Sequence, residues 1–167
     1  MKRLKYVSEF SRYIAPEEIH DIVEKASVNN AKLDISGILM SGDGLFFQIL
    51  EGPEEVVDAL YQKICKDDRH TKVMTVSDDS IEERLFSTWG MRNLDIASEE
   101  QPVLQPVRSL LRAVMGQRTS LNQLMARHAS RGLTADENPL SSQLKQLDDL
   151  LTGIAMVVYT VGDIEAA

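Results

Sequence analysis

Two apolar runs of strand length, joined by a short polar turn, restrict most strongly how this chain can fold. The runs are residues 35–40 and 45–50, and Ser41-Gly42-Asp43-Gly44 lies between them. An Asp-Gly pair favours the tight turn of an antiparallel hairpin, because both central residues of such a turn need a positive φ. The sequence therefore predicts a hairpin here, and with it a sheet that contains antiparallel strands.

Strand and helix patterns alternate on both sides of this hairpin. The predicted elements are a strand at 3–10, a helix from Pro16 to about Asn30, a helix from Pro53, and strands at 72–77 and 87–94. Prolines at helix starts and alternating apolar residues in the strands support these assignments. The order βαββαββ predicts an α+β fold with a ferredoxin-like sheet that carries two helices on one face.

The pattern beyond residue 103 is helical. Residues spaced alternately by three and four run over 104–128, all apolar except Arg118 and His128, and again over 140–158, as the seam positions of a heptad repeat do. We expect a C-terminal helical extension and a parallel coiled-coil homodimer through 104–128. Residues 154–161 are rich in β-branched side chains and fit a strand equally well.

Charge and aromatic residues divide the chain at about the same place. Residues 1–100 hold 12 Lys and Arg against 20 Asp and Glu, and they carry the whole net charge of −8; the remainder has six of each. Eight of the nine aromatic residues also lie in the first hundred. We therefore predict two parts, a domain at 1–97 and a helical output or dimerisation extension at 98–167.

The overall composition disfavours several classes of partner. A pI near 4.9 gives no general attraction for nucleic acid or anionic lipid. Residues 101–135 contain five arginines and no acid, but their mixture with Leu and Met at seam spacing fits packing against an acidic domain or a second subunit better than nucleic-acid binding. No apolar run of about 18 residues exists to cross a membrane.

Cysteine and histidine usage points to a reducing compartment and gives no metal site. Cys65 is the single cysteine, so the chain cannot form an internal disulfide. His20, His70 and His128 show no metal-ligand spacing. We expect a cytoplasmic protein without a bound metal.

Gln48 is the most unusual residue of the predicted sheet. It lies in Leu45-Phe46-Phe47-Gln48-Ile49-Leu50, a run that otherwise predicts a strand buried on both faces. A buried amide needs hydrogen-bond partners, so a polar group must face Gln48. The alternative is a solvated edge or a bond to neighbouring backbone. Taken singly, Tyr6 fits a core position, and Asn29-Asn30 fits a helix C-cap.

Five ordered motifs together resemble the BLUF family of flavin-binding blue-light sensors, over about residues 2–97. The motifs are Leu4-Lys5-Tyr6-Val7-Ser8; Asn29-Asn30 followed by Ile35-Ser36-Gly37-Ile38-Leu39; Phe46-Phe47-Gln48-Ile49-Leu50-Glu51-Gly52; Asp67-Asp68-Arg69-His70; and Trp89-Gly90-Met91. Residues 105–111, QPVRSLL, also look like the connector helix of light-activated adenylyl cyclases of this family.

The resemblance implies roles for three polar residues around a flavin held between the two helices. Tyr6 would donate an electron and a proton to the excited flavin. The Gln48 amide would lie between Tyr6 and the flavin and would rotate or tautomerise, and Asn30 would hydrogen-bond the ring. A phenol with a proton to release and an amide that both donates and accepts suit these roles.

The resemblance implies further contacts to the flavin. The residues matching the ring edge and the ribityl-phosphate region are Asn29, Lys63, Asp67, Arg69 and His70, and those giving apolar contact are Ile22, Ile35 and Phe47. Lys63 stands where an arginine is common, which weakens bidentate phosphate recognition. Trp89 and Met91 match a final-strand pair that passes the signal onward. Solvated helix ends and ordinary core packing remain alternatives for each of these residues.

The resemblance thus implies a non-enzymatic photoreceptor that binds FAD, with FMN or riboflavin as alternatives, and signals to an unidentified protein partner. A second interpretation is the sensory fragment, or a degenerate relative, of a light-regulated nucleotide cyclase. Only about 30 residues follow the connector, too few for a catalytic domain. A third is a ferredoxin-like interaction module without a cofactor, in which Tyr6 and Gln48 are structural.

Overall fold

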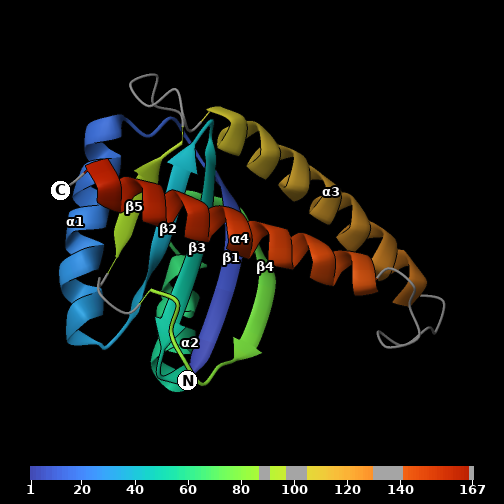
Figure 1. Ribbon diagram of the computed structural model, residues 1–167, viewed down its shortest axis with the longest axis horizontal. Helices are drawn as coiled ribbons and strands as arrows, with labels where there is room; N and C mark the ends of the chain where they lie inside the picture. The colour runs from blue at the N-terminus through green and yellow to red at the C-terminus, as the bar shows by residue number, and fades with distance from the viewer. Residues whose placement is uncertain (87–90, 97–104, 130–140, 166–167) are drawn as a thin grey trace. The chain divides into compact units, whose positions relative to one another are not determined.

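A computed structural model describes residues 1–86, 91–96, 105–129 and 141–165 of the chain, which divides into two compact units, Met1–Glu99 and Glu100–Ala167. In chain order the first unit contains β1 (Lys2–Phe10), α1 (Pro16–Lys32), β2 (Ser36–Gly42), β3 (Leu45–Gly52), α2 (Glu54–Ile64), β4 (His70–Ser80) and β5 (Arg92–Asp95) (Figure 1). The second contains α3 (Gln105–Ala129) and α4 (Ser141–Glu165). None of the helices, over the residues described, combines the length and apolarity of a membrane span.

The first unit is built on a five-stranded sheet with the order β4-β1-β3-β2-β5. Antiparallel pairing joins β4, β1, β3 and β2, whereas β5 pairs with β2 in parallel. Each of α1 and α2 connects two parallel strands that have another strand between them, which is the split βαβ arrangement. The predicted α+β, ferredoxin-like fold with a C-terminal helical extension is confirmed.

Local sequence signals explain where the hairpin and the first helix begin. The β2–β3 turn consists of Asp43 at φ 54° and Gly44 at φ 78°, as a two-residue hairpin turn requires. Helix α1 has Pro16 at its start, Glu17 and Glu18 in its first turn and Lys32 in its last. These residues suit a helix, because proline needs no amide hydrogen there and the charges oppose the helix dipole.

The end of α1 differs from the prediction. The helix continues to Lys32, so Asn29 and Asn30 lie inside it, and the left-handed residue after it is Asp34, at φ 54°. The backbone oxygen of Asn30 accepts hydrogen bonds from the amides of Leu33 (3.0 Å) and Ile35 (2.8 Å). This turn leads the chain directly from α1 into β2.

Two further boundaries differ from the sequence expectation, and both lie towards the C-terminus. The last strand covers Arg92–Asp95, while residues 87–90 of the predicted strand lie outside the described part of the chain. Residues 154–161 belong to α4, so the strand alternative for them is wrong. The three-four spacing of the apolar residues outweighed β propensity, which is only a weak preference.

Alternate residues of each strand face opposite sides of the sheet. Leu4, Tyr6, Leu39, Phe46 and Leu50 share the core cluster packed by α1 and α2, whose apolar side chains are partly buried against it. The intervening side chains of β3 point to the other face and are also buried. The prediction that β3 is buried on both faces is therefore confirmed.

We predict that Gly37→Ala destabilises the first unit, because a β-carbon at this position would lie 2.0 Å from the backbone oxygen of Ile49 on the paired strand. The β2–β3 ladder prevents that oxygen from moving away, so the free energy of unfolding should fall by about 3 kcal/mol. Urea unfolding followed by circular dichroism measures the loss. As a control, Gly116→Ala in α3 meets no atom within 4 Å and should stabilise its helix by about 0.5 kcal/mol or more. Equal stability of Gly37→Ala and the parent would contradict the close approach.

Candidate functional site

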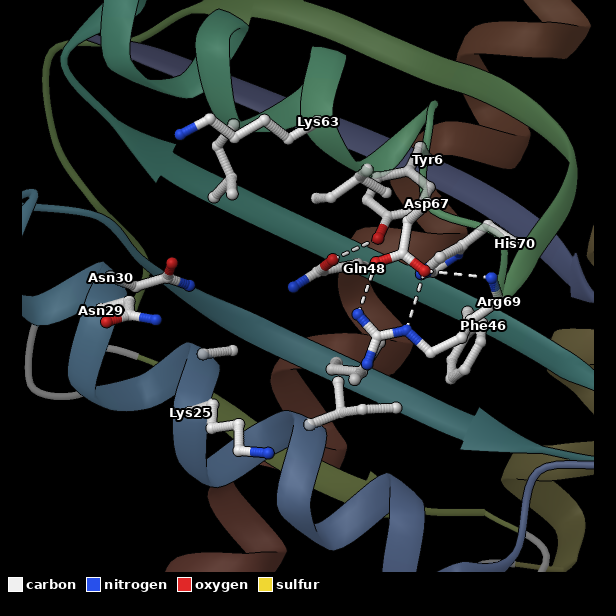
Figure 2. Close-up of a pocket in the computed structure, with 15 residues that line it drawn as sticks. Tyr6, Lys25, Asn29, Asn30, Phe46, Gln48, Lys63, Asp67, Arg69 and His70 are labelled. Atoms are coloured by element: carbon white, nitrogen blue, oxygen red, sulfur yellow. Dashed lines mark hydrogen bonds and ion pairs between the residues drawn. The ribbon is translucent and has the colours of Figure 1, made fainter.

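A cavity of about 260 Å³ is lined by residues of α1, α2, the sheet and the loop that follows α2 (Figure 2). Its lining residues are Tyr6, Ile22, Lys25, Ala26, Asn29, Asn30, Leu39, Phe46, Gln48, Leu60, Lys63, Ile64, Asp67, Arg69 and His70. Apolar side chains and a small number of polar groups thus converge on one hollow, which is the usual composition of a small-molecule site.

A chain of three side chains crosses the sheet side of this cavity. Tyr6 on β1 and Gln48 on β3 are register partners, and the Tyr6 hydroxyl donates a hydrogen bond to Oε1 of Gln48. The Nε2 of Gln48 in turn donates to the Met91 sulfur at 3.2 Å. Gln48 is only 6% exposed. The sequence expectation that a polar group must face this amide is met by the tyrosine.

Burial controls the acid–base state of Tyr6. Its side chain is 1% exposed, and desolvation raises the pKa of the phenol well above its usual range, with the nearby Tyr61, Cys65 and Asp67 adding smaller contributions in the same direction. The phenol therefore stays protonated around neutral pH and donates its proton to the hydrogen bond with Gln48.

Two further amides approach the cavity from the last turns of α1. In Figure 2, Asn29 and Asn30 lie together on one side of the pocket and Gln48 lies between them and the Asp67–Arg69 pair. The Asn30 side chain is 3% exposed and lines the cavity. Because an amide both donates and accepts hydrogen bonds, this side chain suits a polar ligand in the cavity.

Three cationic side chains also line the cavity: Lys25 from α1, Lys63 from α2 and Arg69 from the following loop. The Arg69 guanidinium holds both oxygens of Asp67, with Nε donating to Oδ1 at 2.8 Å and Nη2 donating to Oδ2. The Arg69 backbone amide also donates to Asp67 Oδ1, at 3.0 Å. These hydrogen bonds lower the pKa of Asp67 to about 2. Because Arg69 is engaged by Asp67, Lys25 and Lys63 are the cationic side chains of the lining that suit an anionic group.

His70 closes the cavity beside β1 and β3. Its Nδ1 lies 2.7 Å from the Ser8 hydroxyl, and its ring lies 4.7 Å from that of Phe46, centroid to centroid. Burial lowers the pKa of His70, Asp67 acts in the opposite direction, and Arg69 adds to the lowering. A neutral imidazole at this position adds a polar edge to the cavity without adding charge.

Nine residues expected at the site from the sequence line this cavity. They are Tyr6, Ile22, Asn29, Asn30, Gln48, Lys63, Asp67, Arg69 and His70. Of the proposed signalling pair, Met91 contacts Gln48, and Trp89 lies outside the described residues. The structure therefore brings residues from four separate motifs to one place.

Phe47 and Ile35 are the exceptions. Phe47 was expected to give apolar contact, but it is adjacent to Gln48 in β3 and so points to the opposite face of the sheet; Phe46 lines the cavity instead. Ile35 is buried in the core cluster on the helix side of the sheet but does not line the cavity.

Sequence reasoning missed six lining residues: Lys25, Ala26, Leu39, Phe46, Leu60 and Ile64. A signal for Lys25 was present, because Ile22, Lys25, Ala26 and Asn29 follow one another at helical spacing along one face of α1. A charge inside such a stripe indicates a polar function for that face. Over the described ranges, no group of three or more His, Cys, Asp or Glu side chains is placed to hold a metal ion.

Several known proteins are similar in sequence to this chain. The family model described as "BLUF: Sensors of blue-light using FAD" matches residues 1–92. The photoactivated adenylate cyclase subunit beta of Euglena longa is 36% identical over 138 residues, which cover 81% of this chain but only 16% of that protein. The blue light- and temperature-regulated antirepressor BluF of Escherichia coli is 35% identical over 65% of this chain and 25% of that protein.

Solved structures show the same similarity. A bacterial light-regulated adenylyl cyclase superposes with a TM-score of 0.68 and 38% identity, over 73% of this chain and 36% of that chain. This chain therefore spans well under half the length of these three relatives.

We predict that Arg69→Gln raises the pKa of Asp67 from about 2 towards the ordinary aspartate value of about 4. Because the folded-state pKa lies below the unfolded value, the Asp67–Arg69 pair stabilises the fold above about pH 4 and loses this contribution as the pH falls towards 2. NMR titration of the Asp67 carboxyl carbon measures the change. Arg12→Gln, which removes the exposed Arg12–Glu18 pair, is the control and should leave the Asp67 midpoint in place. An unchanged midpoint in Arg69→Gln would refute the assigned cause.

Proposed function

Because the chain belongs to the BLUF family, the sensors of blue light that use FAD, we propose that its light response begins at Tyr6 and Gln48. The observation that supports this most directly is the Tyr6–Gln48 hydrogen bond at the wall of a cavity that Asn30 also lines. A proton donor (Tyr6), an amide that can relay the proton (Gln48) and an amide that can bind a polar ring (Asn30) thus lie around one cavity.

The residues of the cavity fit a flavin. The polar edge of an isoalloxazine ring alternates carbonyl oxygens with an N–H group, and the amides of Asn30 and Gln48 can both donate and accept. Apolar side chains of α1 and α2, such as Ile22 and Leu60, would contact the faces of the ring. We propose that Lys25 and Lys63 neutralise the phosphates of the tail.

FAD held in this cavity would supply a chromophore that absorbs blue light and, once excited, accepts one electron from a nearby donor. In our proposal Tyr6 gives it one electron and releases the phenolic proton along the hydrogen bond to Gln48 Oε1. Both return as the ground state re-forms, so Tyr6 is not consumed. The Gln48 amide, having exchanged its partners by rotation or tautomerisation, would then make a different set of hydrogen bonds to Tyr6 and the ring.

The same change would transmit the signal through Met91. In the structure Gln48 Nε2 donates to the Met91 sulfur, and a reoriented amide presents its oxygen there instead. We propose that this releases the beginning of β5, and that Trp89 takes part. The C-terminal extension at 98–167 would then pass the change to an unidentified protein partner, in a cytoplasmic setting.

A BLUF domain is a sensor module, which distinguishes it from the catalytic parts of its relatives. Similarity to photoactivated adenylate cyclases covers 16% of their length, so cyclase activity is not carried to this chain by the match. We propose that the chain acts as a non-enzymatic receptor. A cofactor-free interaction module is less consistent with a cavity on which the amide side chains of Asn29, Asn30 and Gln48 converge.

We also propose that the receptor is a homodimer held by its C-terminal helices. Part of the expected seam is used within the chain: Arg118, 8% exposed, donates from Nη1 to the Leu144 carbonyl of α4 at 2.9 Å. Helix α3 still exposes Leu110 (48%) and Leu124 (41%), two heptads apart and therefore on nearly the same face. Such exposed leucines suit contact with a second copy.

We predict that the purified protein with bound FAD shows a reversible red shift of its visible absorption under blue light, and that Tyr6→Phe abolishes it. Phenylalanine has no proton to release and cannot bond Gln48. Tyr61→Phe is the matched control, since the Tyr61 hydroxyl bonds Thr75 (2.8 Å) although its ring lies 5.4 Å from that of Tyr6; it should keep the shift. A protein that binds no flavin, or a full shift in Tyr6→Phe, would defeat the proposal.

We further predict that Leu110→Glu/Leu124→Glu converts a dimer into a monomer in sedimentation experiments, because charges replace the apolar contact surface. Ala126→Glu, at an exposed position on the opposite side of α3, adds one charge as a control and should leave the dimer intact. A parent protein that sediments as a monomer at high concentration would exclude dimerisation through these helices.

A further inference from the structure

A buried carboxylate on β3, away from the cavity, holds the segment that leads towards Met91. Glu51 is 0% exposed, and it lies three residues beyond Gln48 on the same strand, so its side chain points to the opposite face of the sheet. Its Oε2 accepts hydrogen bonds from the backbone amides of Leu85 (2.9 Å) and Phe86 (3.0 Å). Its Oε1 accepts a hydrogen bond from Nε of Arg3 at 2.5 Å.

The segment 83–86 is fastened at other points as well. Nη2 of Arg3 donates to the Glu83 carbonyl at 3.3 Å. Nη2 of Arg84 donates to the Asp34 carbonyl and lies equally close, 2.8 Å, to its carboxylate. Asp34 belongs to the turn between α1 and β2, next to the Asn30 end of the helix. The segment is therefore tied to the end of β3, the start of β1 and the turn after α1.

These ties matter because β5 is a weak element by itself. It pairs with β2 over only four residues, Arg92–Asp95, and a short ladder at a sheet edge opens easily and is poorly fixed in register. Only five peptide steps separate Phe86 from Met91, a reach of at most about 18 Å. An anchor at Phe86 therefore limits where Met91 can lie, and it adds to the short β5 pairing that places the Met91 sulfur at Gln48.

We propose that Glu51 is a positioning residue for the light response, which holds residues 85–86 and thereby sets the contact between Met91 and Gln48. This inference rests on the proposed function, since it assigns Glu51 to the return of the signalling state to the dark arrangement. Glu51 is not among the lining residues of the cavity. It acts on the response through the backbone of the segment and not through the ligand.

The test compares Glu51→Gln with the parent protein in the dark and after illumination. Glutamine has the same shape but loses the negative charge shared by Arg3 and two amides, so amide exchange at Leu85 and Phe86 should quicken by about tenfold or more. FAD binding and the initial red shift should remain. Recovery in the dark should slow by about fivefold, since the segment no longer guides Met91 back.

Three comparisons make the result specific. Asp58→Asn is the matched control. It removes a carboxylate that lies 2.8 Å from Lys2, the residue next to Arg3, and it makes no change near the segment, so this variant should recover at the parent rate. Arg84→Gln removes the tie to Asp34 and should slow recovery to a smaller extent, and it still tests the proposal if Glu51→Gln does not fold. The methyl carbon signal of Met91 in NMR should broaden or split in both segment variants and stay single in Asp58→Asn.

Faster amide exchange in Glu51→Gln together with an unchanged or shorter recovery time and an unaltered Met91 signal would overturn the proposal. If Glu51→Gln does not fold, parent-like recovery and Met91 signal in Arg84→Gln would overturn it. Failure of the proposed function is distinguishable, because the parent itself would then lack the red shift. In that case the exchange and Met91 measurements in the dark still decide whether Glu51 positions this segment.

Discussion

The hydrogen bond between the Tyr6 hydroxyl and Oε1 of Gln48 is the interaction on which the arrangement of the site depends. It joins the two central strands at a register pair, on the face that α1 and α2 cover. It satisfies an amide that could not otherwise be buried, and it fixes that amide so that its nitrogen faces Met91. One bond therefore sets the orientation of the residue between the cavity and the last strand.

The rest of the first unit buries the two partners of this bond and places other groups around them. Helix α1 supplies the two asparagines and one lysine, α2 supplies a second lysine, and the loop after α2 contributes Arg69, fixed by Asp67. Burial keeps the phenol protonated by raising its pKa. On the opposite face of β3, Glu51 accepts hydrogen bonds from the amides of Leu85 and Phe86, which precede β5 in the chain. Strand β3 thus places the Gln48 amide on one face of the sheet and the Glu51 carboxylate on the other.

Several of these features were predictable because they depend on local chemistry. The Asp43-Gly44 turn dictates the hairpin, and Pro16 with two following acids dictates where α1 begins. Gln48 stood out because a polar residue interrupts a strand that is apolar on both faces. Phe46 and Phe47 show the limit of such reasoning: two identical residues are adjacent, and only the direction of the pleat decides that Phe46 lines the cavity.

Local patterns are enough to predict the βαββαββ order, the helical extension and the need of Gln48 for a polar partner, since periodicity, turn chemistry and the cost of burial act over a few residues. Three features depend on the assembled fold: the strand register that pairs Tyr6 with Gln48, the extension of α1 to Lys32, and the contact of Glu51 with residues 85–86. These contacts join residues more than 30 positions apart, or depend on the backbone beyond the helix. They arise only when the sheet has assembled, because no local pattern encodes which distant amide a buried carboxylate will accept.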